Sequence, residues 1–445
     1  MVEWNRVKIG DVCTLEKGTT GLANANTGDY PLVATGAQRK TSKEYQFDAK
    51  AVCIPLVSST GHGKKTLNYV HYQEGKFALG TILVAVIPKN ENIISSRYLH
   101  IHLQKNKDRV LVPLMKGAAN VSLSVKDIAN IEIPLPSIKE QGEIINKIDS
   151  ISDEHLEFLN ETDVQFNLLE QLRQSTLQEA TEGKLTAKWR CEHPELISGD
   201  NHASKLLENI RSEKERLIKE GKIKKEKPLA HISDDKKPFE LPDGWVWCYF
   251  DDIKENKKNA LKAGPFGSSL KKDCYVKHGY KIYGQEQVIA NDAFIGNYYI
   301  DEKKFKELKS CEVKPGDILI SLVGTIGKLL ILPDGIEPGI INPRLLKISL
   351  YQAIDRGYIS LLFKSPLIID EIKSMSHGGF MDVINLGIMK KLHFPLPTIV
   401  EQKAIVDQVD KLLAFVNELE KQVSKRKEQS EMLMQSALRE AFATS

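Results

Sequence analysis

Polar and basic side chains gather on a few glycine- or serine-bearing loops of this 445-residue chain. Two of these loops read TGAQRKTSK and SSTGHGKKT, and two later ones read GPFGSSLKKD and KIYGQEQV. Lys and Arg suit contacts to phosphate, and Gln, Ser, Arg and His can hydrogen bond to base edges. Such loops, when strands hold them, commonly carry binding residues. The candidate binding residues are Gln38, Arg39, Ser59, His62, Lys64, Lys65, Ser268, Ser269, Lys271, Gln285, Gln287, Thr325, Lys328 and Arg344.

Complete catalytic motifs are missing, although three stretches approach one. GTIGKLL would need glycine in place of Leu322 and Ser or Thr after Lys328 to be a phosphate loop. Asn342 is not followed by the Pro-Pro-aromatic set of amino-methyltransferases, and Asp334 and Glu337 have no lysine two residues beyond the glutamate, as a nuclease site needs. The 11 histidines show no HExxH spacing. We therefore expect no catalytic site, no metal and no cofactor bound by this chain.

Cysteine usage and hydropathy indicate the cellular compartment of the protein. The 6 cysteines are scattered and show no metal-ligand spacing. No long apolar run could span a membrane, and the N-terminal MVEWNRVKIGD lacks the apolar core of a signal peptide. These features predict a cytoplasmic protein with reduced thiols.

Charge is distributed unevenly although the formal net charge is only +3. Residues 1–130 hold 17 Lys and Arg against 10 Asp and Glu, whereas residues 131–181 hold 3 against 11. A polyanion would be attracted to the first segment and repelled by the second. A charge excess that serves only solubility is the competing interpretation.

A long internal repeat organises the chain. The stretch from Gly117 to Ala180 recurs from Gly378 to Ala441 at a constant offset of 261 residues, without a gap. PLPSIKEQ in the first copy becomes PLPTIVEQ in the second, and QSTLQEA becomes QSALREA. A two-copy element of this kind indicates a tandem duplication.

Each copy has the pattern of a short strand that stops at two prolines and leads into a long helix. Proline removes a ladder hydrogen bond and disfavours a helical residue before it, so the strand must end there. Ser137 and Thr398 are suitable N-caps, and Glu140 and Glu401 stand three residues later as capping-box partners. Gly183 is a suitable stop for the first helix.

Apolar residues recur at alternating steps of four and three along both predicted helices, which is a heptad seam. The seam residues are Ile144, Ile148, Ile151, His155 and Phe158 in the first copy and Ile405, Val409, Leu412, Val416 and Leu419 in the second. Each helix would be roughly 64 Å long at ~1.5 Å per residue. The equal register favours pairing of the two helices; the alternative is that each packs on its own domain.

Together, several motifs resemble the specificity (S) subunit of Type I restriction-modification enzymes. They are PLPSIKEQ and PLPTIVEQ before long helices, LRQSTLQEATEGKLT, IRSEKERLIKEGKIKKEKPL followed by ELPDGWVW, and KPGDILISLVGTIGK with INPRLLKI. The resemblance covers essentially the whole length. It implies two target-recognition domains, each reading one half of a bipartite DNA site from the major groove, with two antiparallel helices between them as a ruler.

The resemblance also implies partners. A non-catalytic S subunit binds two methyltransferase (M) subunits, which would use S-adenosylmethionine, and restriction (R) subunits join through the assembled complex. The candidate binding residues would then be contacts to double-stranded DNA. Two other functions stay open: a coiled-coil adaptor that does not bind DNA, and a complete enzyme with its own methyl-transfer site.

The expected fold class is α+β, with two α/β domains, two long antiparallel helices and a pseudo-two-fold repeat. Trp245 and Ile253 open the second domain as Trp4 and Val12 open the first. The charge-dense connector is expected to be a surface helix plus linker, or alternatively a DNA-backbone contact. The expected boundaries are 1–136 and 241–397 for the two domains, 137–183 and 398–445 for the helices, and 184–240 for the connector.

Overall fold

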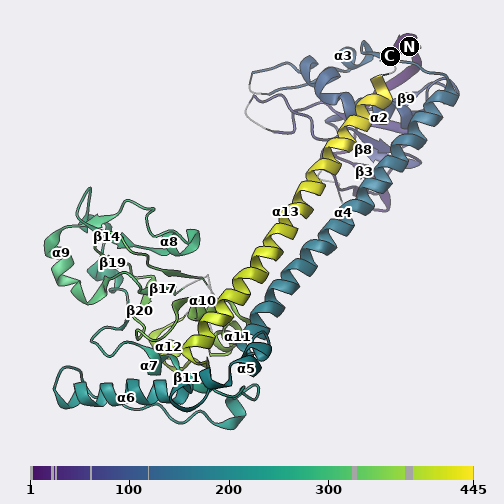
Figure 1. Ribbon diagram of the computed structural model, residues 1–445. Helices are drawn as coiled ribbons and strands as arrows, with labels where there is room; N and C mark the ends of the chain where they lie inside the picture. Colours follow the sequence, from purple (N-terminus) through teal and green to yellow (C-terminus); the bar gives the residue numbers. More distant parts are fainter. Residues whose placement is uncertain are drawn as a thin grey trace. The chain divides into compact units, whose positions relative to one another are not determined.

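The computed structural model describes residues 4–21, 25, 28–60, 63–118, 120–322, 328–375 and 384–443. The chain divides into two compact units, Met1–Val164 with Val423–Ser445 and Gln165–Gln422. Each unit contains one globular domain and part of each of the two long helices, α4 (Ile138–Thr181) and α13 (Ile399–Ala443) (Figure 1). Within the described residues no helix is both long and apolar enough to cross a membrane.

The first domain is built from two four-stranded sheets, in the orders β2-β9-β6-β7 and β4-β3-β8-β5. Only β3 and β8 pair in parallel among the described strands of these sheets. The strands are β2 (Cys13–Lys17), β3 (Tyr30–Val33), β4 (Lys40–Ser42), β5 (Phe47–Asp48), β6 (Ala51–Pro55), β7 (His71–Gln73), β8 (Lys76–Leu79) and β9 (Leu83–Pro88).

Strand β9 separates two hydrophobic cores. Val84 and Val86 point into a core that includes helix α2 (Ser96–Val110), whereas Leu83 and Ala85 point into a core shared with the second sheet. Burial on both faces explains the continuous apolar run that the sequence shows here. The apolar runs AVCIPLV and GTILVAVIP contain β6 and β9, and the basic stretch SSRYLHIHLQKNKDR contains α2.

The second domain repeats this topology. Its sheets have the orders β12-β20-β17-β18 and β13-β15-β14-β19-β16, with β14 parallel to β19 as β3 is to β8. The strands are β12 (Leu261–Ala263), β13 (Tyr275–Val276), β14 (Tyr280–Tyr283), β15 (Tyr299–Ile300), β16 (Glu312–Val313), β17 (Ile318–Ser321), β18 (Leu329–Ile331), β19 (Gly339–Ile341) and β20 (Leu345–Ile348). The stretch GIINPRLLKISL contains β19 and β20, which Asn342–Arg344 separate, so Arg344 lies directly before the start of β20. The domain-level duplication is confirmed.

Helices and turns complete the two domains. In the first domain they are α1 (Ile9–Val12), η2 (Val112–Leu114) and α3 (Val125–Ala129). In the second they are α7 (Phe250–Ile253), η6 (Gly267–Ser269), η7 (Lys272–Cys274), α8 (Gln285–Ala290), α9 (Glu302–Glu307), η8 (Lys309–Cys311), α10 (Arg356–Lys364), α11 (Pro366–Met375) and α12 (Leu386–Lys391).

Each long helix follows a two-stranded ribbon. β10 (Glu132–Pro134) pairs with β1 (Arg6–Lys8), and β21 (His393–Leu396) pairs with β11 (Val246–Tyr249), both antiparallel. A buried tyrosine hydroxyl donates to a proline carbonyl in each ribbon: Tyr98 to Pro134 at 3.1 Å, and Tyr358 to Pro395 at 2.7 Å. The sequence repeat therefore extends into matched contacts with the two diverged domains.

A buried glutamine in each PLP-x-x-x-E-Q motif ties the helix start to its domain. The Gln141 side chain donates to Pro136 O at 2.9 Å and accepts from the N–H of Ser95 at 2.8 Å. Gln402 makes the same pair of bonds, to Pro397 O at 3.0 Å and from the N–H of Asp355 at 2.8 Å. Ser95 and Asp355 precede α2 and α10, so the two long helices anchor equivalent helices of the two domains.

The helix caps differ between the copies. Ser137 and Glu140 form the expected capping box, with bonds of 2.7 and 3.3 Å. In the second copy Thr398 Oγ1 accepts from the N–H of Glu401 at 3.3 Å. The Glu401 carboxylate, however, lies in a buried network with Trp245 and Arg190. The expected second capping box is therefore only half formed, because its carboxylate has stronger partners.

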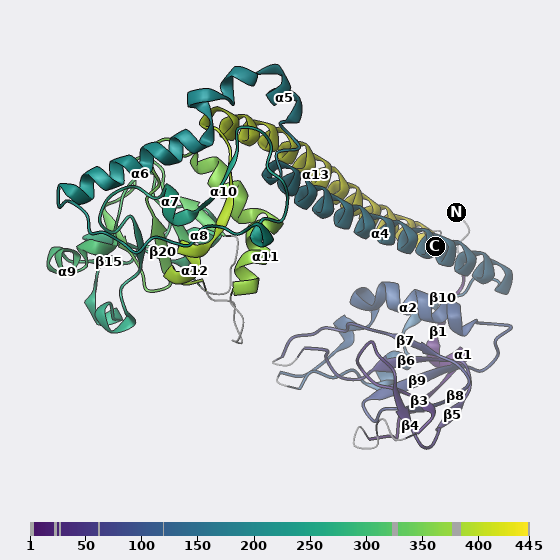
Figure 2. The ribbon, with the colours of Figure 1, turned by 90° about the horizontal axis from the view of Figure 1, so that it is seen from below.

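Helices α4 and α13 lie side by side in both views, with opposite chain directions (Figures 1 and 2). In the first unit His155 Nδ1 lies 2.9 Å from Ser430 Oγ, and Lys427 donates to Asp163 at 3.2 Å. In the second unit Arg173 donates to Asn417 at 2.9 Å and to Glu420 at 3.2 Å. In the first unit the numbers fall along α13 as they rise along α4, and both views show opposite chain directions, so the pairing is antiparallel.

The expected seam is only partly right. All five predicted α4 residues are buried or half-buried, as are Ile405, Val409 and Val416 of α13. At the helix starts, however, Ile144 packs against the first-domain core and Ile405 and Val409 lie in the second-domain core, as in the alternative that each helix packs on its own domain. Leu412 and Leu419 are each 40% exposed, because the contact passes to their neighbours Leu413 and Glu420. Two successive steps of four, through Val409 and Leu413, follow the natural 3.6-residue turn and rotate the seam away from the heptad positions.

The connector belongs to the second unit. Helix α4 stops at Thr181, and Gly183 has φ +74, as expected for a C′ residue. α6 (Ala203–Lys219) packs Leu207 and Ile210 into the core of the second domain, which confirms the surface helix. The connector also contains α5 (Ala187–Glu192), η3 (Pro194–Leu196), η4 (Gly199–Asn201) and η5 (Asp234–Lys236).

Candidate nucleic-acid interface

Arg39 is the most firmly held candidate in the first domain. It lies just before β4, and its guanidinium reaches β7 of the other sheet. Nε donates to Gln73 Oε1 at 2.9 Å, one Nη donates to Tyr72 O at 3.0 Å, and the other lies 3.3 Å from His71 Nδ1. Partial burial lowers the pKa of Arg39 from its ordinary value of 12.5. The residue nevertheless remains exposed, as does Gln38 beside it.

The other candidates of the first domain lie on the loop that follows β6. Ser59 is exposed, and its Oγ accepts from the N–H of Asn68 at 2.9 Å, which orders the loop. Lys64 and Lys65 are exposed on the same loop. His62 lies outside the described residues. Two flexible cations on an ordered loop suit contacts to a phosphate backbone.

In the second domain the structure brings Gln285 and Arg344 together. Arg344 donates to Gln285 Oε1 at 3.3 Å, and Gln285 Nε2 donates to Ser321 Oγ at 2.7 Å. The turn before Arg344 is fixed by Asn342, whose Oδ1 accepts from the Arg344 N–H at 2.9 Å. Thr325 lies outside the described residues, and Lys328, which follows it, is exposed.

The GPFG loop starts beside this arginine. Gly264 donates its N–H to Leu345 O at 2.8 Å, and a Cβ on Gly264 would lie 1.8 Å from Asn342 O. Only glycine permits this approach. The loop then exposes Phe266 by 86% and carries three candidates, of which Ser268 and Lys271 are exposed and Ser269 is half-buried.

Gln287 is not available to a ligand, so this part of the prediction is wrong. Its side chain is 0% exposed. It accepts from the N–H of Gly284 at 2.7 Å and donates to Ile295 O at 3.0 Å. These bonds cap α8 and fix the following loop, and a side chain committed in this way cannot reach a base edge.

Sequence reasoning missed the residues that hold the arginines. Gln73, His71 and Ser321 carry no local signal, because their role depends on how distant strands pair. The exposed Phe266 was marked by its place between proline and glycine in GPFG. Within the part of the chain that the structure describes, no group of three or more His, Cys, Asp or Glu side chains could hold a metal ion.

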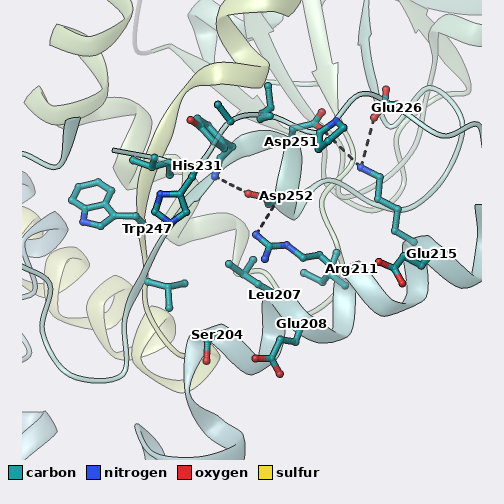
Figure 3. A pocket seen from close by; sticks show the side chains of 18 of the residues that line it. Ser204, Leu207, Glu208, Arg211, Glu215, Glu226, His231, Trp247, Asp251 and Asp252 are labelled. Atoms are coloured by element: carbon teal, nitrogen blue, oxygen red, sulfur yellow. Dashed lines mark hydrogen bonds and ion pairs between the residues drawn. The ribbon is translucent and has the colours of Figure 1, made fainter. Parts of the chain in front are cut away.

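A cavity of about 850 Å³ lies between α6, the extended segment 225–232 and the start of the second domain. Figure 3 shows Arg211 reaching from α6 toward Asp252, and the two charged groups are 3.6 Å apart. Lys214 lies 3.7 Å from Glu226 and 3.8 Å from Asp251. Arg211 and Lys214 therefore already have carboxylate partners within the second unit.

Glu226 fastens the connector to the domain. It accepts from Lys254 at 2.7 Å and from Lys390 at 3.1 Å. Partial burial alone would raise the pKa of Glu226, but the hydrogen bonds and charges of the two lysines outweigh it and lower the pKa to about 2. The contacts favour a structural role for the connector over the DNA-backbone contact considered from the sequence.

Two domains of one topology, each with an exposed arginine held by a glutamine and each joined to one of two paired helices, define a duplicated binding protein. The sequence matches the family described as "Type I restriction modification DNA specificity domain" over residues 1–165 and 266–428. The chain belongs to this family.

Curated relatives are specificity subunits of Type I restriction enzymes. The EcoAI subunit of Escherichia coli is 30% identical over 299 residues, which are 65% of this chain and 46% of that protein. The EcoEI subunit of the same organism is 26% identical over 281 residues and is matched over 45% of its length, so the chain spans less than half of these two relatives. The MjaVIII subunit of Methanocaldococcus jannaschii is 24% identical over 445 residues, covering 96% of this chain and 90% of that protein.

Solved structures share the fold. The HsdS subunit from Thermoanaerobacter tengcongensis has a TM-score of 0.54 at 16% identity, with 99% of this chain and 96% of that chain covered. A chain from a study of complex assembly and conformational transition of the type I R-M system has a TM-score of 0.59 at 15% identity, with 99% and 97% covered. The likeness supports the two-domain architecture with paired helices.

Proposed function

We propose that this chain is the non-catalytic, cytoplasmic DNA-specificity subunit of a Type I restriction-modification enzyme. One observation carries the proposal: two domains of the same topology present different loop chemistry. The first domain presents the lysine pair Lys64 and Lys65 together with Arg39, whereas the second presents Phe266, 86% exposed, together with Arg344. Two domains with the same topology but different loop side chains would read the two different halves of an asymmetric bipartite site.

The paired helices would set the gap between the two half-sites. Half-sites read from one face of B-DNA lie about one helical turn, roughly 34 Å, apart. To set a fixed gap, the two helices must not slide along each other. Ion pairs such as Lys427–Asp163 and Arg173–Glu420 fix the register of the helices in each unit. Methyltransferase subunits would supply the chemistry with S-adenosylmethionine, and restriction subunits would join through the assembled complex.

An exposed apolar face on the helix pair suits a partner subunit. Five side chains within the second unit contribute to it, and each is at least 40% exposed: Leu168, Leu172, Leu412, Phe415 and Leu419. Each stands one position before a residue of the helix contact: Leu168 and Leu172 precede the half-buried Leu169 and Arg173, and the three α13 residues precede Leu413, Val416 and Glu420. In an antiparallel pair, such positions on both helices turn to the same side. We therefore assign methyltransferase docking to this face, because apolar side chains on a solvent-facing helix mark protein contacts.

The direct test is duplex DNA binding by the chain in complex with its methyltransferase partner. Affinity should fall steeply with salt, with a log–log slope of about −0.9 for each phosphate contacted. Methylome sequencing of cells that carry both proteins should give one bipartite motif. Salt-independent or absent DNA binding would instead favour the coiled-coil adaptor.

Two exchanges test the architecture separately. Inserting or deleting whole heptads at matched points of α4 and α13 should change the number of unspecified bases between the half-sites. Exchanging residues 1–130 for those of another specificity subunit should change one half-site and leave the other. A fixed gap, or a change in both halves, would contradict the ruler and the independent reading respectively.

A further inference from the structure

The Arg39 guanidinium is oriented before any ligand arrives. Its three hydrogen-bond partners are three consecutive residues, His71, Tyr72 and Gln73, on the edge strand β7. Arg39 itself precedes β4, the edge strand of the other sheet. The side chain therefore bridges two sheet edges, and its plane is fixed by one backbone carbonyl and two side chains of β7.

The contacts to β7 leave some of the N–H donors of Arg39 unused. Arginine has five N–H donors and no acceptor. Three are used: Nε–H by Gln73, one on an Nη by Tyr72 O, and one on the other Nη by His71 Nδ1. Because arginine can only donate, His71 Nδ1 must accept, which requires a neutral ring. Burial, with help from the Arg39 charge, lowers the pKa of His71 to about 4 and keeps the ring neutral at physiological pH.

Two N–H groups, one on each Nη, remain for a ligand, on a residue that is exposed. A ligand that uses both must present two acceptors to a planar donor. In the major groove guanine alone offers an acceptor pair, O6 and N7, whereas adenine pairs one acceptor with a donor. Phosphate can also accept two hydrogen bonds from arginine, but the exposed Lys64 and Lys65 of the same domain already supply cations for contacts to the DNA backbone.

We propose that Arg39 is a specificity-determining residue that reads one guanine in the half-site of the first domain through O6 and N7, and that Gln73 is its positioning residue. The proposal rests on the proposed function of the chain. Residue type alone predicted only that Arg39 contacts DNA. The geometry adds the base that Arg39 would read, and it adds Gln73, which the sequence analysis did not select.

The test uses the complex with the methyltransferase partner and a duplex carrying the target identified by methylome sequencing. Each guanine of the first half-site is replaced in turn by 7-deazaguanine, which keeps the base pair but lacks the N7 acceptor. One position should weaken wild-type binding about 10- to 150-fold, the effect of losing one hydrogen bond to a charged group. Arg39→Ala should lose discrimination at the same position about 5- to 150-fold and should show no further loss with 7-deazaguanine.

Gln73 is tested through the same coupling. Gln73→Leu removes the acceptor for Nε and should reduce the 7-deazaguanine effect at that position, although Gln73 itself touches no base. Gln73→Glu restores an acceptor and should recover the effect. A loss of thermal stability without a change in base preference, in both Arg39→Ala and Gln73→Leu, would show that the bridge is only structural and would overturn the proposal.

Lys65→Ala is the matched control for a phosphate contact. It should weaken all sequences alike and reduce the salt slope by about 1. If Arg39→Ala behaves in the same way, or if no guanine in the first half-site couples to Arg39, the guanine assignment is refuted. Absence of salt-dependent DNA binding by the wild-type complex would instead refute the proposed function, so the two failures are distinguishable.

Discussion

Trp245 donates a 2.7 Å hydrogen bond from its indole Nε1 to Oε2 of the fully buried Glu401. The other carboxylate oxygen accepts from Arg190 at 2.5 Å and from Thr186 at 2.7 Å. In the first copy Trp4 reaches Glu140 at 3.3 Å, where the carboxylate is more exposed. The same tryptophan–glutamate contact thus serves as a buried charge network in one repeat and as a looser helix cap in the other.

This asymmetry predicts unequal costs for equal substitutions. Glu401→Ala leaves the Arg190 guanidinium, whose side chain is 12% exposed, without its carboxylate and should lower the free energy of unfolding by about 3–5 kcal/mol. Glu140→Ala, the matched control, should cost clearly less. Denaturant unfolding of both variants measures the difference, and equal losses would contradict the network.

Gly264→Ala should destabilise the second domain by about 1–3 kcal/mol, because its Cβ would lie 1.8 Å from Asn342 O and the two backbones would have to separate. Gly267→Ala, three residues later, is the control, since nothing lies within 4 Å of a Cβ there. Thermal unfolding compares the two. An unchanged melting temperature in Gly264→Ala would disprove the close approach.

His393 predicts a pH-dependent stability. Burial alone would lower its pKa, but the hydrogen bond and charge of Glu371, 2.5 Å away, outweigh burial and raise the pKa above 6.5. Because the folded state binds this proton more tightly, the stabilisation is complete below about pH 6.5 and is lost as the pH rises through the folded pKa. Unfolding free energies at about pH 6 and about pH 8.5 should converge in His393→Gln; an unchanged difference would exclude this residue as the source.

Phe415→Ser should weaken binding of the methyltransferase partner without unfolding the chain, since Phe415 is 73% exposed. Leu156→Ser is the control: that residue is 58% exposed and stands one position after, not before, a seam residue of α4. Co-purification and circular dichroism report binding and folding separately. Equal weakening by both variants would argue against the assigned docking face.

Features that depend on local pattern could be predicted from the sequence. The gapless repeat fixed the starts of α4 and α13, and Gly183 marked the end of α4. Leu412 and Leu419 were misassigned because a strict heptad cannot reveal a local return to the 3.6-residue period. That error concerns two turns of helix, not the pairing itself.

The candidate site could be predicted only by residue type. Arg39 and Gln73 are 34 residues apart and meet only because β4 and β7 are edge strands of adjoining sheets, which no single-sequence pattern shows. Gln287 resembled Gln285 in the same motif, but an α-helical turn directs the first inward and leaves the second near Arg344. Which polar side chains lie close enough to interact as a pair therefore depends on their separation in the sequence and on the order of the strands.

The division of the chain into Met1–Val164 with Val423–Ser445 and an intervening unit bears on biosynthesis. Lys427 reaches Asp163 from 264 residues downstream, so α4 leaves the ribosome long before its counterpart in the first unit exists. The intervening unit, by contrast, has all of its own residues before that counterpart is translated. The face of α4 that contacts α13 therefore stays uncovered through most of translation. This makes α4 the segment where a chaperone or a premature partner would bind first.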